Sequence, residues 1–332
     1  MRALYSAAMR VAVIGAGGIG GLYGGMLARA GHTVSFLARG PHLDAIRARG
    51  LEVRSAQFGT FTVQAPASAD PADLGPADLV LFAVKTYDLA AAAAAARPLL
   101  APDASLITFQ NGVEAPAQVA AIVGQPHVLI GTTRVETTVL EPGVIGHLSA
   151  GHLITASEFD GPPTARVEQL VETLKAAGLN AVVAHDGQRA LWEKAAVLIP
   201  MSTVTAVCRA PFGPIRDLPE TRQLITTLLD EVRVVARASG VELGDAVGPR
   251  GLTIESAPAA MTTSLARDFE RGNRTELDAL VGALVRLGDA HGVDVPAART
   301  TYAILKLRAE RPQAEQDEAG ASEALGVPAA RR

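Results

Sequence analysis

The segment Arg10–Gly20, RVAVIGAGGIG, constrains the fold more than any other part of the chain. Residues 11–14 form an apolar run that predicts a strand, and residues 19–30 predict a helix. Glycines spaced as G-x-G-x-x-G make the tight turn, let the backbone approach a pyrophosphate and let the helix pack on the strand. The N–H groups at the helix start also favour an anion. Instead of a glycine-rich surface turn, we therefore predict a dinucleotide site formed by Gly15, Ala16, Gly17, Gly18, Ile19 and Gly20.

Composition narrows the class of protein. The 332 residues suffice for two domains, and 48% hydrophobic against 19% charged residues is typical of a globular chain. A net charge of −4 argues against a general nucleic-acid binder. The single cysteine, Cys208, excludes an internal disulfide and fits a cytoplasmic location. We expect no membrane span and no metal site.

The second strand carries information on the dinucleotide. It covers residues 32–37 and continues into Arg39, and no acidic residue occurs between Gly20 and Asp44. An NAD enzyme should end this strand with a carboxylate that holds the ribose 2′-hydroxyl, whereas an arginine suits a 2′-phosphate. The sequence therefore favours NADP(H) over NAD(H). An ordinary surface arginine is the alternative, in a chain with 26 arginines and only four lysines.

Two further strands place polar residues where ligands bind. Residues 78–84 form a buried strand that ends at Lys85, and residues 105–109 form a strand that ends before Asn111. Ligands bind at the carboxyl ends of the strands in a parallel sheet. We therefore predict that Lys85 and Asn111 face the cofactor, and Asn111 also the substrate. The alternatives are a solvent-exposed lysine and a turn asparagine before a glycine.

The remaining pattern gives an organisation in two domains. We expect residues 51–54 and 60–64 to form a hairpin appended to the sheet, and residues 135–148 and 152–156 to be antiparallel strands at its edge. From Gly187 onward the long segments, 187–199, 218–239, 262–271 and 275–291, predict helices. The fold class is thus an α/β Rossmann-type domain with a mostly parallel sheet (residues 9–185), followed by an all-α domain (residues 186–309). Residues 1–8 and 310–332 are expected to be disordered, with Met9 a natural first residue.

Six stretches in this order resemble the ketopantoate reductase (2-dehydropantoate 2-reductase) family over roughly residues 9–307. They are VIGAGGIG at 13–20, VKT at 84–86, QNGV at 110–113, GTT at 131–133, LWEK at 191–194 and RTELD at 274–278. The resemblance implies NADPH-dependent reduction of a 2-keto acid in a cleft between the two domains. The implied reaction converts 2-dehydropantoate to pantoate in pantothenate biosynthesis.

The resemblance also implies roles for individual residues. The proton-donating lysine of the family falls on Lys194, its acidic residue on Glu276 and its substrate-binding serine on Ser264. Its 2′-phosphate arginine, cleft lysine and asparagine fall on Arg39, Lys85 and Asn111. Lys194 also has chemical support, because hydride delivery to a ketone leaves negative charge on oxygen, and a lysine among apolar neighbours can supply the proton.

Each of these roles has a structural alternative. Lys194 could extend out of a packed helix into solvent. Glu276 lies inside Thr275-x-x-Asp278, which has the form of a capping box at a helix start. Ser264 could be a helix-entry residue.

The chain departs from the family pattern where the substrate would bind. The family has asparagines four and eight residues after its lysine, and Leu198 and Ser202 occupy these positions here. A further family asparagine falls on Phe212. Ser202 could still hold a carboxylate oxygen, but leucine and phenylalanine offer no hydrogen bond. An alternative is therefore a paralogous dehydrogenase of a more apolar 2-oxo or 3-hydroxy acid. A non-catalytic NADP-binding sensor is a third possibility. Dimerisation through residues 218–239 is expected, with packing inside the domain as the alternative.

Overall fold

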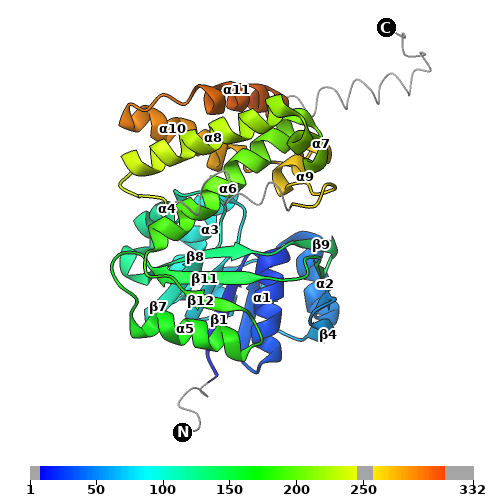
Figure 1. The fold of residues 1–332 in the computed structure, drawn as a ribbon. Helices are drawn as coiled ribbons and strands as arrows, with labels where there is room; N and C mark the ends of the chain where they lie inside the picture. The colour runs from blue at the N-terminus through cyan, green and yellow to red at the C-terminus, as the bar shows by residue number, and fades with distance from the viewer. Residues whose placement is uncertain (1–7, 245–256, 311–332) are drawn as a thin grey trace, which may run out of the picture. The chain divides into compact units, whose positions relative to one another are not determined.

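The computed structural model describes residues 8–244 and 257–310, which form two compact units, Met1–Leu191 and Trp192–Arg332. Figure 1 shows the helices and strands of each unit. Of the ends expected to be disordered, 1–8 and 310–332, residues 1–7 and 311–332 lie outside the described residues. Glu310, placed in the C-terminal tail by the sequence pattern, is instead the last residue of a helix.

An eight-stranded sheet is the centre of the first unit, with the order β12-β11-β8-β7-β6-β1-β2-β5. Its central strands are β1 (Arg10–Ile14), β2 (Thr33–Leu37), β6 (Ala77–Phe82), β7 (Leu100–Thr108) and β8 (Val128–Arg134). Its outer strands are β5 (Ala67–Ser68), β11 (Leu153–Glu158) and β12 (Ala181–Val183). Every pairing is parallel except that of β8 with β11. The predicted mostly parallel sheet is thus confirmed.

The strand order reverses at β1, and the neighbouring strands end together. β1 pairs with β2 on one side and with β6 on the other, so that Ile14 lies between Leu37 and Phe82. On the far side of β6, Phe82 pairs with Thr108 of β7. The loops after these four strands therefore begin side by side. In open α/β sheets such a reversal point is where ligands bind.

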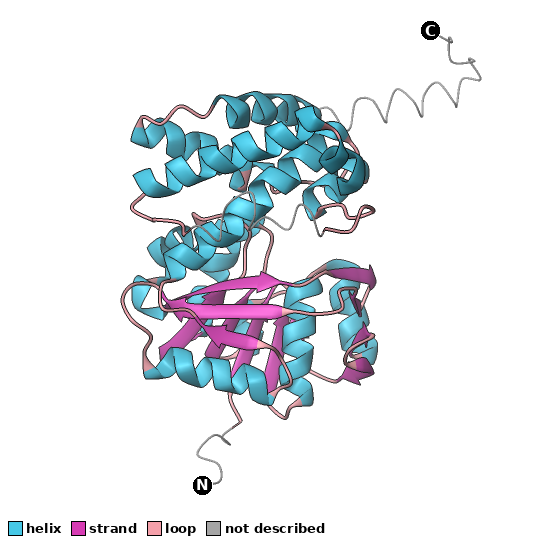
Figure 2. Cartoon of the chain, in the orientation of Figure 1, coloured by secondary structure: helices cyan, strands magenta, loops and turns pink. Residues whose placement is uncertain are grey.

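Helices cover both faces of this sheet (Figure 2). α1 (Gly18–Arg29) and α5 (Ala165–Ala176) share one apolar core with the sheet, which includes Val13 and Phe36. α3 (Leu89–Ala96) and α4 (Ala115–Val123) share the other core, which includes Ile14 and Phe82. Alternate residues of β1 thus enter opposite cores, as the strand period requires. Both faces are buried, as expected for a parallel sheet.

A second, four-stranded sheet lies outside α1, in the order β4-β3-β10-β9. It consists of β3 (Leu51–Ser55), β4 (Gly59–Val63), β9 (Thr137–Glu141) and β10 (Val144–His147). The predicted hairpin of β3 and β4 is present, but the expectation that it extends the main sheet was wrong. β10 pairs in parallel with β3 and joins two hairpins that are far apart in sequence. The long separation explains why no local pattern shows this pairing.

Small residues on α1 permit this second sheet to pack closely. A Cβ added at Gly21 would lie 2.6 Å from Cγ1 of Ile145, and one added at Gly18 would lie 2.5 Å from Oγ1 of Thr137. The two glycines are three positions apart (i and i+3), so both lie on one helix face. The same helix therefore contacts two sheets, which accounts for its glycine content. α2 (Gly40–Arg49) precedes β3.

The second unit is helical in its described part. It contains most of α6 (Gly187–Cys208), followed by α7 (Phe212–Asp217), α8 (Pro219–Ala238), α9 (Ser264–Glu270), α10 (Val281–His291) and α11 (Pro296–Glu310). A short 3-10 helix, η5 (Leu277–Ala279), precedes α10. α8 packs against α7, α10 and α11. The buried face of α8 thus packs inside the unit.

The helices of the second unit differ from the sequence expectation in several places. α6 continues nine residues beyond Ile199 and contains Pro200, although a proline inside a helix costs about 3 kcal/mol. The buried residues after it, with Val204 at 0% exposure, offset that cost by packing. α11 was not among the predicted helices. Its first N–H groups, at Ala297 and Ala298, donate to the carboxylate of Glu231 on α8, each at 2.8 Å.

α6 also has the length and apolar composition of a membrane span, which the sequence analysis did not identify. In the protein, 67% of its most apolar window is buried. A core helix gives the same signal, so the feature is weak evidence for a membrane.

Candidate dinucleotide and proton-donor residues

The predicted residues of the first unit gather at one edge of the main sheet. Gly15 follows β1, Arg39 follows β2 by two residues, Lys85 follows β6 and Asn111 follows β7. These four strands are neighbours and end in register. The carboxyl edge therefore brings together a glycine loop, two cationic side chains and an amide from distant parts of the sequence.

The glycine loop has the geometry that the motif predicts. Gly15 has a φ of +94°, and a Cβ there would lie 2.8 Å from the backbone nitrogen of Val84. A Cβ at Gly20 would lie 2.2 Å from the carbonyl oxygen of Gly15. The first glycine thus makes the turn and the third permits the helix to pack on the strand, as expected. The loop also touches the backbone just before Lys85.

The surroundings of Gly17 show that this edge can accept a pyrophosphate. It is the N-cap residue of α1, and a Cβ built on it would meet no atom within 4 Å. The first turn of α1 carries no acidic side chain. An open space beside helical N–H groups without a competing carboxylate fits a bound anion. Gly18 differs, because its missing side chain makes room for Thr137 of the protein itself. Ala16 and Ile19 pack their side chains on the core.

His42, which the sequence analysis missed, connects the glycine loop to the second sheet. Its Nε2 lies 2.8 Å from the carbonyl oxygen of Ala16, and its Nδ1 lies 3.0 Å from the backbone nitrogen of Gly143. A backbone N–H can only donate, so Nδ1 accepts and Nε2 donates. A histidine three residues after Arg39 gave no signal by itself, because Gly143 is 101 residues away.

Arg39 forms an ion pair with a residue from the loop after β6. One terminal nitrogen of its guanidinium lies 2.9 Å from a carboxylate oxygen of Asp88, in η2 (Thr86–Asp88). The Arg39 side chain is 77% exposed and that of Asp88 is 35% exposed. A carboxylate thus stands beside the predicted 2′-phosphate arginine, where the second strand supplied none.

Gln110 holds the loops that carry Lys85 and Asn111. Its Nε2 donates to the carbonyl oxygens of Phe82 (2.9 Å) and Val84 (3.1 Å), at the end of β6. Gln110 is 5% exposed, and its Oε1 has no hydrogen-bond partner within the described ranges. The side chain therefore fixes the spacing between two adjacent strand ends. The QNG sequence predicts a turn, but it does not predict these two hydrogen bonds from Gln110 to the end of β6.

Lys194 lies on the less buried stripe of α6. Residues 193, 194, 197 and 198 are half-buried, whereas residues 191, 192, 195, 196 and 199 are buried. Lys194 and Leu198 therefore lie one turn apart on the same face. Ser202, two turns after Lys194, is fully buried, and its hydroxyl has no hydrogen-bond partner in the part of the chain that the structure describes.

Ser264 is tied to α6 through its neighbour. Thr263 is the N-cap residue of α9, its hydroxyl accepts from the backbone N–H of Ala266, and it lies 2.9 Å from the hydroxyl of Thr205 on α6. Ser264 itself is the first residue of α9 and is half-buried. Phe212 is fully buried, and its backbone nitrogen donates to Met261.

Glu276 does not take part in a capping box. It is 7% exposed and is the N-cap residue of η5, without a side-chain cap. The α-helix begins only at Val281, because Leu280 leaves helical geometry with a ψ of −103°. Asp278, the assumed fourth position, instead accepts from the hydroxyl of Tyr302 (2.7 Å) and from Lys306 (3.1 Å). The capping-box interpretation was therefore wrong, since tertiary contacts take this carboxylate.

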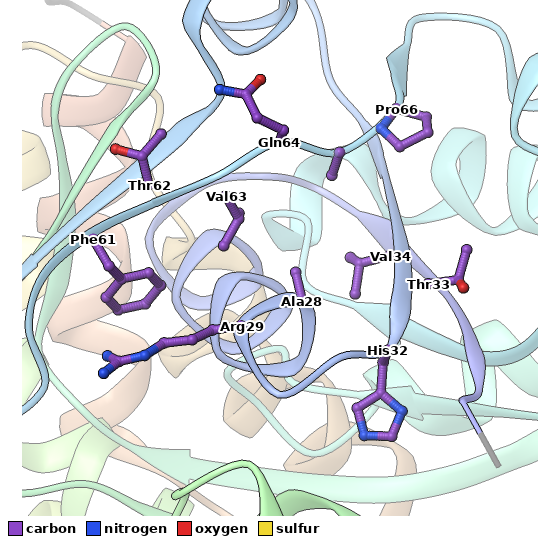
Figure 3. Close-up of a pocket in the computed structure, with 11 residues that line it drawn as sticks. Ala28, Arg29, His32, Thr33, Val34, Phe61, Thr62, Val63, Gln64 and Pro66 are labelled. Carbon is purple, nitrogen blue, oxygen red and sulfur yellow. The ribbon is translucent and has the colours of Figure 1, made fainter.

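A pocket of about 490 Å³ lies elsewhere on the first unit, between the end of α1 and the segment after β4 (Figure 3). Its lining includes Thr33 and Val34 at the amino end of β2, so it lies away from the carboxyl edge. Arg29 extends beneath the ring of Phe61, 4.7 Å from its centroid, and also donates to Phe58. The Arg29 guanidinium thus already contacts groups of the protein itself. Among the described residues no group of three His, Cys, Asp or Glu is placed to hold a metal ion.

Comparisons with known proteins agree in one family. The family model described as ketopantoate reductase PanE/ApbA matches residues 11–161, and the model of its C-terminal part matches residues 186–309. A 2-dehydropantoate 2-reductase from Halobacterium salinarum is 32% identical over 300 residues, which cover 90% of this chain and 98% of the relative.

Solved structures give the same result. A PanE/ApbA family ketopantoate reductase from Ralstonia eutropha has a TM-score of 0.85 at 35% identity, covering 92% of this chain and 100% of its own. A D-mandelate dehydrogenase with NADH and anilino(oxo)acetate has a TM-score of 0.84 at 20% identity, covering 92% and 99% of the two chains. At that identity the likeness shows the fold alone.

Proposed function

Because the chain belongs to the ketopantoate reductase family, we propose that it reduces a 2-keto acid to a 2-hydroxy acid with NAD(P)H, and that 2-dehydropantoate is the substrate. One structural observation carries the proposal: the glycine loop, Arg39, Lys85 and Asn111 meet at the carboxyl edge where the strand order reverses. The reaction would serve pantothenate biosynthesis, and the single cysteine supports a cytoplasmic location.

The first unit holds the dinucleotide in this proposal. The backbone of residues 15–20 faces the pyrophosphate, which the open space at Gly17 supports. Arg39 binds toward the adenosine ribose, and Lys85 and Asn111 bind toward the nicotinamide end. When bound, NAD(P)H supplies the hydride. Glu276 of the second unit is proposed to contact both the cofactor and the substrate, as the family resemblance implies.

Lys194 donates the proton. Hydride addition leaves negative charge on the carbonyl oxygen, and a cation that also carries a transferable proton stabilises that charge as it develops. Lys194 is half-buried on α6, where Leu191, Ala195 and Leu198 lie within about one turn of it. Arginine could supply charge at this position but does not release a proton near neutral pH.

The substrate is bound by fewer amides than the family pattern provides. Asn111, Lys194, Ser202 and Ser264 are the proposed polar contacts, and the unpartnered hydroxyl of Ser202 supports its inclusion. Leu198 and the fully buried Phe212 offer no hydrogen bond. These two residues favour a second candidate function: reduction of a more apolar 2-oxo acid on the same framework, or oxidation of a 3-hydroxy acid.

A panel of keto acids separates these possibilities. Loss of NADPH absorbance would be followed with 2-dehydropantoate and with 2-keto acids of increasing apolar side chain, for the native protein and Leu198→Asn. Fast turnover of 2-dehydropantoate supports the main proposal. A preference for apolar substrates that Leu198→Asn reverses supports the second candidate. NADPH binding without turnover of any panel member would overturn both in favour of a sensor.

A further inference from the structure

The sequence around the second strand supplies a cation for the adenosine ribose but no carboxylate. β2 is followed by Arg39, and no acidic residue occurs between Gly20 and Asp44. On that basis the chain carries a group for a 2′-phosphate and none for a 2′-hydroxyl. The structure changes this interpretation, because it brings Asp88 from the neighbouring strand end to Arg39.

The geometry of the pair leaves both groups able to bind a ligand. The ion pair joins one guanidinium nitrogen to one carboxylate oxygen at 2.9 Å. A guanidinium has five N–H donors and a carboxylate has about four acceptor positions, so this single bond uses a small part of each. With 77% of the Arg39 side chain and 35% of the Asp88 side chain exposed, both groups reach solvent.

Resting on the proposed function, we propose that Asp88 is the ribose carboxylate of this site and that the protein uses both NADH and NADPH. The 2′-hydroxyl of NADH donates to Asp88. The 2′-phosphate of NADPH binds Arg39 but meets the negative charge of Asp88, which weakens that binding. Asp88 therefore reduces the preference for NADPH that Arg39 alone would give. It is a specificity-determining residue supplied by the segment after β6 and not by the end of β2.

Asp88→Asn tests this assignment cleanly. The substitution keeps the size of the side chain and removes its charge. Asp88 is the N-cap residue of α3 but makes no side-chain cap bond, so the helix loses no cap. The matched control is Asp103→Asn, an exposed residue in the amino-terminal half of β7 and hence at the opposite end of the sheet.

The dissociation constants of NADH and NADPH would be measured by fluorescence titration without any keto acid. We expect the native protein to bind both within about a hundredfold of each other. Asp88→Asn should weaken NADH by about tenfold and tighten NADPH, Arg39→Met should weaken NADPH alone by at least about tenfold, and Asp103→Asn should change neither. An unchanged NADPH/NADH ratio in Asp88→Asn would overturn the inference, as would exclusive use of one cofactor by the native protein.

The readout separates this inference from the proposed function. If dinucleotides bind with the expected shifts and no keto acid is reduced, Asp88 keeps its role and the proposed reaction is wrong. If the folded protein binds neither dinucleotide, both are wrong.

Discussion

Nε2 of His42 donates a hydrogen bond to the carbonyl oxygen of Ala16, 2.8 Å away, in the middle of the glycine loop. The opposite nitrogen of the same ring accepts the N–H of Gly143, in the turn between β9 and β10. Nε2 therefore carries a proton, and Nδ1 is the acceptor. It fixes the loop against a second sheet whose strands are remote in sequence.

We expect His42→Leu to weaken NADPH binding by about fivefold, because a loop hydrogen bond contributes about 1 kcal/mol to the ordered conformation. His42→Gln retains an amide that can donate to Ala16, so it should recover most of the affinity. Turnover at saturating NADPH should change little in either variant. If His42→Leu keeps the NADPH affinity of the native protein and only its melting temperature falls, the prediction is contradicted. The hydrogen bonds of His42 would then stabilise the fold without ordering the glycine loop for binding.

Gln110→Glu should destabilise the protein more than Gln110→Met does. The glutamate oxygen would face the carbonyl oxygens of Phe82 and Val84, which now accept from an amide. We expect a loss of about 1–3 kcal/mol in the free energy of unfolding at pH 8, measured with urea. The loss should shrink in acid, where the protonated carboxyl donates instead. Equal stability of the two variants at pH 8 would contradict the proposed role of Gln110 in holding the two strand ends together.

Glu158 gives the protein a pH-dependent contribution to stability. Burial alone would raise the pKa of this carboxyl, but hydrogen bonds from Arg166 and Thr164 hold the pKa below its usual value of 4.5. A carboxyl with a lowered pKa in the folded state stabilises at pH values above its unfolded pKa, and this stabilisation is lost as the pH falls.

Glu158→Gln should therefore lower the free energy of unfolding by about 1–2 kcal/mol at pH 7, a modest value because 37% of the Arg166 side chain is exposed. The difference from the native protein should narrow as the pH falls below about 4.5. Glu172→Gln is the matched control, since Glu172 pairs with Lys175 on the surface, where a pair contributes less than about 1 kcal/mol. A constant difference from pH 7 to pH 3 would contradict the assignment.

The sequence predicted the parts of the fold that local patterns encode. The strand–glycine–helix unit, the buried strand before Lys85 and the helical second unit all follow from periodicity and turn residues. The second sheet did not, because β10 joins β3 across about ninety residues, from Ser55 to His147. The motif glycines predicted the loop and the packing of α1 on β1, but not the second sheet, where Ile145 packs on Gly21.

The candidate site shows the same division. Arg39, Lys85 and Asn111 could be predicted because each follows its strand within three residues. His42, Asp88 and Gln110 could not, because each acts through a contact with a backbone or side chain from another strand end. The local sequence from Thr275 to Asp278 has the form of a capping box, but Asp278 instead accepts hydrogen bonds from Tyr302 and Lys306 on α11.

Lys194 is the residue on which the proposed reaction depends most directly. The deciding measurement compares turnover of the best keto acid by the native protein, Lys194→Met and Lys194→Arg, with NADPH affinity measured alongside. Lys175→Met on α5 is the control for loss of a lysine. We predict unchanged NADPH affinity and a loss of turnover of at least about a hundredfold in both Lys194 variants, because arginine keeps the charge but not the transferable proton. Turnover within about tenfold of native in Lys194→Met would contradict the account, because the proton would then come from elsewhere.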